Sequence, residues 1–176
     1  GESKSGAFVP ATGREIIASR MVRGETVPYI LELRLPMMQY LEVDLNFSLD
    51  YKNSGTDTLK KMLSQTEQIS VGNTPLQTLC EEDFFLHLCG HLYKEAATLP
   101  WIQMKRDMTL YKYCDIYMLM RRMTERQITR LMCRAEALHM LDILCFAILQ
   151  TAELFASANC IAVQRAAKAM LGREAF

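Results

Sequence analysis

Apolar and polar residues alternate over one segment near the start of the chain. Between residues 40 and 49 the apolar positions are Leu41, Val43, Leu45, Phe47 and Leu49, and the polar positions between them are Glu42, Asp44, Asn46 and Ser48. A period of two over this length predicts a β-strand. We expect its apolar face to pack on a core and its polar face to present Glu42 and Asp44 side by side.

The segments before this strand are shorter. Residues 12–21 have helical spacing, residues 27–35 read as extended, and Pro36 breaks that run. After a turn at residues 53–55 the pattern predicts a short helix over 56–65 and a linker over 71–75. Three of the five prolines of the chain lie in residues 1–52, which read as strand and loop.

The rest of the chain reads as successive helices, expected over residues 78–98, 107–123, 124–140 and 159–170. Capping boxes at Thr78 with Glu81 and at Thr124 with Gln127 predict two helix starts. Pro100 is expected to end the first long helix and to leave Trp101 in a loop. The helix from residue 124 either continues to residue 155 or breaks near His139, and Gly172 is a possible final stop.

These elements predict an α+β fold dominated by helices. We expect a small antiparallel sheet packed on an antiparallel bundle of about four helices. The predicted division is a sheet domain over residues 1–54 and a helical bundle over residues 55–176.

Composition narrows the class of protein. Half of the residues are hydrophobic, which excludes a disordered chain. Twenty basic residues balance twenty acidic ones, so charge gives no reason to expect nucleic acid or an anionic membrane as partner. No apolar run reaches the roughly 18 residues of a membrane-spanning helix. The six cysteines form no C-x-x-C pair, so we expect reduced thiols in the core of a cytoplasmic protein.

Glu42 and Asp44 are the first candidates for chemistry. Residues two apart on a strand point to the same side, so both carboxylates would face one site. Carboxylate oxygens are ligands that Mg²⁺ prefers. The alternative is an ordinary solvated face of an antiparallel sheet.

The second candidates lie on one helix. Asp83, His87, His91 and Glu95 recur every four residues and share one stripe. They are either hydrogen-bonded residues where the helix meets a neighbour, or, with Lys94, contacts for a substrate or phosphate. Zinc-peptidase chemistry is not supported, because Leu88 occupies the position where that motif requires Glu.

Two further positions have a functional and a structural interpretation. Asp115 lies at the edge of an apolar helix face, where a carboxylate usually pairs with a basic group. Arg134 and His139 have the spacing of the HEPN ribonuclease motif, in which such a pair stabilises phosphate charge and moves a proton. The same spacing also arises by chance.

Two segments carry a resemblance to a known family. LHLCGHLYKEA (residues 86–96) followed by LYKYCDIYMLM (residues 110–120) resembles the helical part of the uncharacterised nucleotidyltransferase-like family of the DNA polymerase beta superfamily. YLEVDLNFSLDY (residues 40–51) is similar to the strand that closes the catalytic sheet of that family. The resemblance covers about residues 7–155.

The resemblance implies a parent enzyme that transfers a nucleoside monophosphate from a nucleoside triphosphate to an unknown acceptor, using Mg²⁺. Asp44, with Glu42 beside it, would be the third carboxylate of the site and the metal ligand. The family's Gly-Ser turn and Asp-x-Asp pair are missing from this sequence. We therefore expect the front of the catalytic domain upstream of Gly1, and an isolated chain that is inactive.

By position match, the bundle would contribute His91, Lys94, Glu95 and Asp115 to binding of the nucleotide and acceptor. Lys94 would meet a triphosphate oxygen, and Glu95 or Asp115 would orient the acceptor. Two alternatives remain at this point, a non-enzymatic helical module that binds a partner protein through an apolar groove, and a HEPN-like ribonuclease. The sequence leaves the oligomeric state open.

Overall fold

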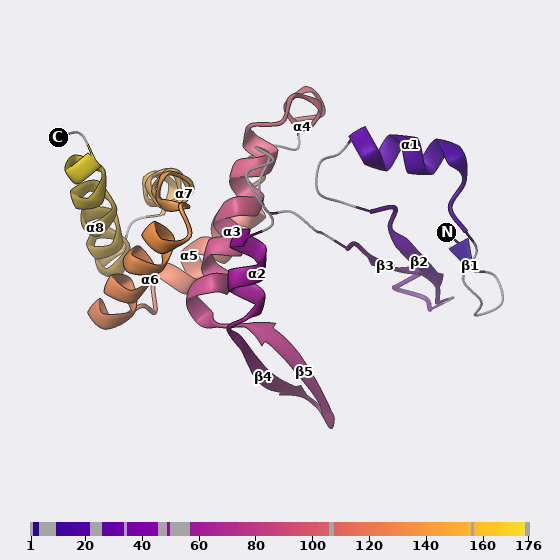
Figure 1. The fold of residues 1–176 in the computed structure, drawn as a ribbon, viewed down its shortest axis with the longest axis horizontal. Coiled ribbons are helices and arrows are strands. Elements are labelled where there is room, and N and C mark those ends of the chain that lie inside the picture. Colours follow the sequence, from indigo (N-terminus) through magenta and orange to yellow (C-terminus); the bar gives the residue numbers. More distant parts are fainter. Residues whose placement is uncertain are drawn as a thin grey trace. The chain divides into compact units, whose positions relative to one another are not determined.

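The computed structural model describes residues 2–3, 10–21, 26–33, 35–45, 49, 57–105, 108–155 and 157–174. The chain divides into two compact units, Gly1–Leu59 and Lys60–Phe176, and each is described by itself. The predicted α+β class, dominated by helices, is confirmed (Figure 1). The domain boundary expected after residue 54 stays a prediction.

In the residues that the structure describes, the first unit holds a small sheet and one helix. Its elements are β1 (Glu2–Ser3), α1 (Gly13–Met21), β2 (Tyr29–Glu32) and β3 (Tyr40–Val43). The strands lie in the order β1-β2-β3, with β1 parallel to β2 and β2 antiparallel to β3. Thr12 precedes α1, and its amide donates to the Glu15 carboxylate while its hydroxyl accepts from the Glu15 amide, which stabilises the start of the helix.

The strand predicted over residues 40–49 is shorter in the structure. β3 ends at Val43, and residues 46–48 and 50 lie outside the described part. The prediction that its apolar face packs on a core is wrong for Leu41, Val43 and Leu45, which are between 44% and 49% exposed. Alternation predicts which side chains share a face, whereas burial requires a second layer, and no described helix packs extensively over this sheet.

The second unit is a helical bundle with a β-hairpin. Its elements are α2 (Asp57–Leu63, which spans the boundary between the units), β4 (Thr66–Val71), β5 (Thr74–Leu79), α3 (Glu81–Ala96), α4 (Leu99–Gln103), α5 (Leu110–Met120), α6 (Glu125–Ala137), α7 (Leu141–Leu154) and α8 (Ala158–Glu174). α3 packs on α5, α6 and α7, and α7 also packs on α5 and α8. Their inward faces form the core, with fully buried side chains that include Phe85, Leu92, Ile116, Leu131, Leu144 and Ile148.

The linker predicted over residues 71–75 is wrong, because this segment forms the tip of the antiparallel hairpin β4–β5. Val71 pairs with Thr74, so Gly72 and Asn73 make a two-residue loop. Gly72 has a φ of 60°, which a residue without a side chain adopts at low cost. A Gly-Asn pair between two potential strands is a hairpin signal, and the linker prediction overlooked it.

The helix boundaries agree with the sequence at some ends and not at others. The capping box of Thr124 and Gln127 at the start of α6 is confirmed. The one expected at Thr78 is wrong, since Thr78 pairs within β5 and Cys80 precedes α3. Two alternatives were open for the helix from residue 124, and the structure has the break near His139, because His139 separates α6 from α7 with a φ of 56°.

Pro100 and Gly172 do not end the helices that they were expected to end. α3 ends at Ala96, before Pro100, and Pro100 instead lies in the first turn of α4, where its missing N–H costs no hydrogen bond. Trp101 is therefore part of a short helix and not of a loop. α8 continues through Gly172 to Glu174.

All six cysteines are free thiols. Cys89, Cys145 and Cys160 are buried as expected, whereas Cys133 is exposed. Burial raises the pKa of the Cys89 thiol, so this group stays protonated. None of the described helices combines the length and the apolar character that a membrane crossing requires.

Candidate functional site

The polar stripe of α3 turns around the helix as it runs along it. A step of four residues advances the stripe by about 40° beyond a full turn, so from Asp83 to Glu95 it rotates by about 120°. Its two ends consequently face different neighbours. Asp83 contacts α6, and Glu95 contacts α5.

At the first end, Asp83 and Arg134 form a two-pronged ion pair. Nε and Nη2 of Arg134 each donate to one carboxylate oxygen of Asp83, at 2.7 Å. Arg134 Nη2 also donates to the backbone oxygen of Lys61, in the last turn of α2, at 3.2 Å. The hydrogen bond with Asp83 raises the pKa of Arg134. This cation thus joins α2, α3 and α6, which is a structural role.

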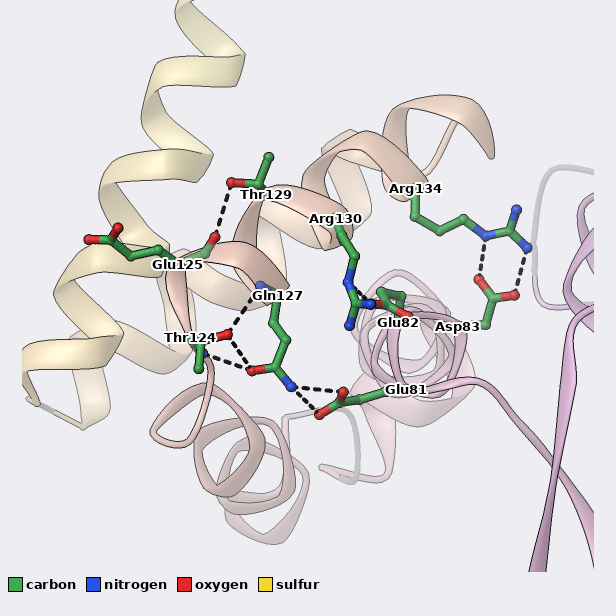
Figure 2. A network of polar contacts seen from close by, with 9 residues as sticks. All are labelled: Glu81, Glu82, Asp83, Thr124, Glu125, Gln127, Thr129, Arg130 and Arg134. Atoms are coloured by element: carbon green, nitrogen blue, oxygen red, sulfur yellow. Dashed lines mark hydrogen bonds and ion pairs between the residues drawn. The ribbon is translucent and has the colours of Figure 1, made fainter.

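Two further pairs extend the contact between α3 and α6 (Figure 2). Gln127 Nε2 donates to both oxygens of Glu81, and Arg130 Nε lies 2.8 Å from Glu82 Oε1. Three consecutive acids of α3 therefore meet one face of α6. The hypothesis that the stripe is hydrogen-bonded where the helix meets a neighbour is confirmed at this end.

At the other end, Glu95 joins α3 to α5. Its carboxylate pairs with Lys112 of α5, and its Oε1 lies 3.1 Å from Nε2 of His91. Lys94, Glu95 and Lys112 are all buried, with exposed fractions of 5% to 7%. Burial lowers the pKa of Lys112. Two cations, one carboxylate and an exposed imidazole thus lie within two adjacent helices.

The sequence-based site omitted Lys112. Lys112 lies beside Tyr113 on the buried face of α5. A residue on such a face is taken for part of the packing between helices and not for a ligand-binding residue. A signal did exist, because the segment LYKYCDIYMLM (residues 110–120), which carries the family resemblance, contains this lysine. The charge that Lys112 brings to Glu95 makes it part of the same cluster.

His87 is the remaining member of the stripe and is partly buried. Its pKa is lowered from the ordinary value of 6.5, first by burial and then by the positive charge of Lys94. His87 is therefore neutral at physiological pH. A neutral imidazole beside a buried ammonium group can accept a hydrogen bond or a proton.

The other predicted site residues are exposed. Asp115 is exposed on α5, one turn from Lys112. Glu42 lies in β3, opposite Ile30 of β2, and Asp44 follows the end of that strand. Both carboxylates belong to the first unit, whereas His91, Lys94, Glu95 and Asp115 belong to the second. That these two sets meet in one site stays a prediction, as does a metal at Asp44.

Arg134 and His139 do not form a free pair for ribonuclease chemistry. The guanidinium group of Arg134 is held by Asp83 and by the Lys61 carbonyl. His139 lies in the left-handed conformation that ends α6 and is exposed. In the part of the chain that the structure covers, Arg134 joins α6 to α3, and His139 forms the turn between α6 and α7.

Comparison with known proteins gives one positive result. No curated protein and no solved structure matches the chain. A family model described as uncharacterised nucleotidyltransferase matches residues 23–156, which contain both acids at β3 and the whole α3–α5 cluster. Since this match spans most of the 176 residues, the chain belongs to the family of uncharacterised nucleotidyltransferases.

Proposed function

We propose that this protein takes part in transfer of a nucleoside monophosphate from a nucleoside triphosphate to an acceptor not yet identified. The observation that carries the proposal is the family match, since it extends over both sets of predicted site residues. In such a reaction an acceptor oxygen attacks the α-phosphorus, the bond to pyrophosphate breaks, and the acceptor's proton passes to a base or to water.

The cluster between α3 and α5 suits a polyanion. Lys94 and Lys112 bring two positive charges, and Glu95 balances one of them. Both lysines are buried, and in such a poorly solvated environment a charge interacts more strongly than in water. Lys94 would meet a triphosphate oxygen, and Glu95 would orient Lys112 and His91. Asp115, which is exposed, would be available to the acceptor.

Glu42 and Asp44 fit the proposed third carboxylate and Mg²⁺ ligand by chemistry and accessibility. Both side chains are exposed and carry oxygen donors of the kind Mg²⁺ prefers. When bound, Mg²⁺ would neutralise phosphate charge. The sequence contains no Gly-Ser turn followed by an Asp-x-Asp pair. We therefore propose that further acids of the site come from outside this sequence. We also propose that the isolated chain has no activity.

The test compares this chain with the complete gene product. Binding of ATP, GTP, CTP and UTP with Mg²⁺ is measured by calorimetry. Transfer is then followed with triphosphates labelled at the α- or the γ-phosphate, in an extract that supplies acceptors. Nucleotidyl transfer moves the α label and not the γ label. Movement of the γ label would indicate phosphoryl transfer and contradict the proposal.

Lys94→Met tests the cluster, because Met keeps the aliphatic packing of this buried side chain and removes its charge. Lys168→Met is the matched control, since Lys168 is an exposed lysine of α8. We expect nucleotide binding by the complete protein to weaken about tenfold or more in Lys94→Met and to stay unchanged in Lys168→Met. Equal binding by both would refute the role of Lys94. A complete protein that binds no nucleotide would favour the non-enzymatic interaction module.

A further inference from the structure

The hairpin β4–β5 extends away from the helices of its unit (Figure 1). It forms a sheet of two strands only, and no other described strand pairs with it. Every residue of β4 is exposed. A two-stranded sheet in this setting has two free edges, and a free edge is a template for another strand.

The register shows which backbone groups point outward. The Cys80 amide donates to the Gln65 carbonyl, so these two residues form a hydrogen-bonded pair at the base of the hairpin. Hydrogen-bonded and non-bonded pairs alternate along an antiparallel ladder. The non-bonded pairs are therefore Thr66 with Leu79, Gln68 with Gln77, and Ser70 with Pro75. The N–H and C=O groups of these residues point away from the hairpin.

The two edges differ in what they can accept. On β5 the outward position nearest the tip is Pro75, which has no N–H and thereby interrupts that edge. On β4 the outward residues Thr66, Gln68 and Ser70 all carry an N–H. β4 contains no proline, lysine or arginine, the usual means of blocking an edge. The edge of β4 is thus the open one.

We propose that the edge of β4 pairs with β4 of a second copy of this chain, in an antiparallel and symmetric arrangement. Pairing Gln68 with Gln68 of the second copy uses all three outward residues of each strand. It also sets Thr66 opposite Ser70, a cross-strand hydroxyl pair that stabilises antiparallel sheets. Two identical edges related by a two-fold axis are complementary to each other in this register.

Charge and apolar surface favour the same occupant. Glu67 is the only charged residue between Thr66 and Leu79, and in this register it lies opposite Ile69, so no like charges meet. The chain has no net charge that would keep two copies apart. Ile69, Val71 and Leu76 share one face of the hairpin and are 44% to 59% exposed. In the four-stranded sheet the apolar residues of both copies form one continuous face.

Proline substitution tests the edge itself. Gln68→Pro removes an outward N–H without removing a hydrogen bond of the hairpin, and Gln77→Pro does the same on the edge that Pro75 already interrupts. The oligomeric state is measured by sedimentation across a dilution series, with circular dichroism and thermal melting to check folding. We expect dimers in the unmodified chain and in Gln77→Pro. Gln68→Pro should associate at least about tenfold more weakly, since two hydrogen bonds are lost per dimer.

A pair of double variants tests the register without proline. Thr66→Lys with Ser70→Lys sets lysine opposite lysine twice in the symmetric pair and should abolish the dimer. Thr66→Glu with Ser70→Lys sets glutamate opposite lysine twice and should restore it. A monomeric unmodified chain would overturn the proposal. The proposal would also be overturned if Gln77→Pro weakened the dimer as much as Gln68→Pro. It would be overturned too if neither double variant changed the dimer.

Discussion

Arg134 offers the sharpest test of the contacts that hold the second unit together. Arg134→Met keeps the aliphatic stem of the side chain and removes the guanidinium group. Asp83 then keeps a carboxylate that has no exposed surface and loses both of its 2.7 Å hydrogen bonds. A buried charge that loses its partner costs about 3–5 kcal/mol of unfolding free energy.

The reverse substitution should cost less. Asp83→Asn leaves the charge on Arg134, whose side chain is 19% exposed and still reaches the Lys61 carbonyl. Arg134 can therefore recover solvation, and we expect a loss of about 1–3 kcal/mol. Arg130→Met is the matched control, because the pair of Arg130 with Glu82 is 52% exposed on the arginine side and contributes about 0–1 kcal/mol.

The assay is urea unfolding followed by circular dichroism, with the unfolding free energy extrapolated to water. The expected order of destabilisation is Arg134→Met, then Asp83→Asn, then Arg130→Met. If Arg134→Met loses no more than about 1 kcal/mol beyond Arg130→Met, Asp83 is not an uncompensated buried charge and the reasoning fails.

Three further predictions concern stability. Thr151→Val should stabilise the protein by about 1 kcal/mol in thermal melts, because the fully buried Thr151 hydroxyl has no hydrogen-bond partner in the described part of the chain. Gly72→Ala should cost about 1 kcal/mol through its φ of 60° alone, since no atom lies within 4 Å of the added carbon, and Gly72→Asn should cost less. Burial and then Lys94 lower the pKa of His87 below 6.5, so its contribution to stability is complete above that pH and declines as pH falls below it. His87→Gln should weaken this decline in urea unfolding at about pH 5 and pH 7.

Each of these predictions has an outcome that contradicts it. A loss of stability in Thr151→Val would mean that the hydroxyl has a partner, such as a buried water. Equal melting temperatures for Gly72→Ala and Gly72→Asn would show that the turn changes its conformation. An unchanged acid dependence in His87→Gln would contradict the assignment of this titration to His87.

The helices were predictable where their signals are local. The apolar spacing and the capping box of Thr124 and Gln127 depend on residues at most four positions apart, and α6 starts where they predict. Asp83 was placed on a stripe that meets a neighbour, but its partner Arg134 is 51 positions away. Spacing predicts which side of a helix a residue occupies and not which helix lies against that side.

The candidate site was predictable only in part for the same reason. The stripe of α3 was evident from the four-residue spacing, whereas Lys112 was missed because its relation to Glu95 depends on how α5 packs on α3. The burial of the β3 face was predicted wrongly, because alternation carries no information about what covers a sheet. The roles of Glu42 and Asp44 stay predictions.

Position 127 accepts fewer residue types than the capping box of α6 alone would allow. A capping box accepts Glu or Gln at this position, because either can receive the hydrogen bond of the Thr124 amide, which here is 2.9 Å long. The other end of the Gln127 amide donates to both oxygens of Glu81. Glutamate at position 127 would set one carboxylate against another. Among related sequences, Glu at this position should therefore occur only where residue 81 is no longer acidic, a covariation that joins the first turns of two separate helices.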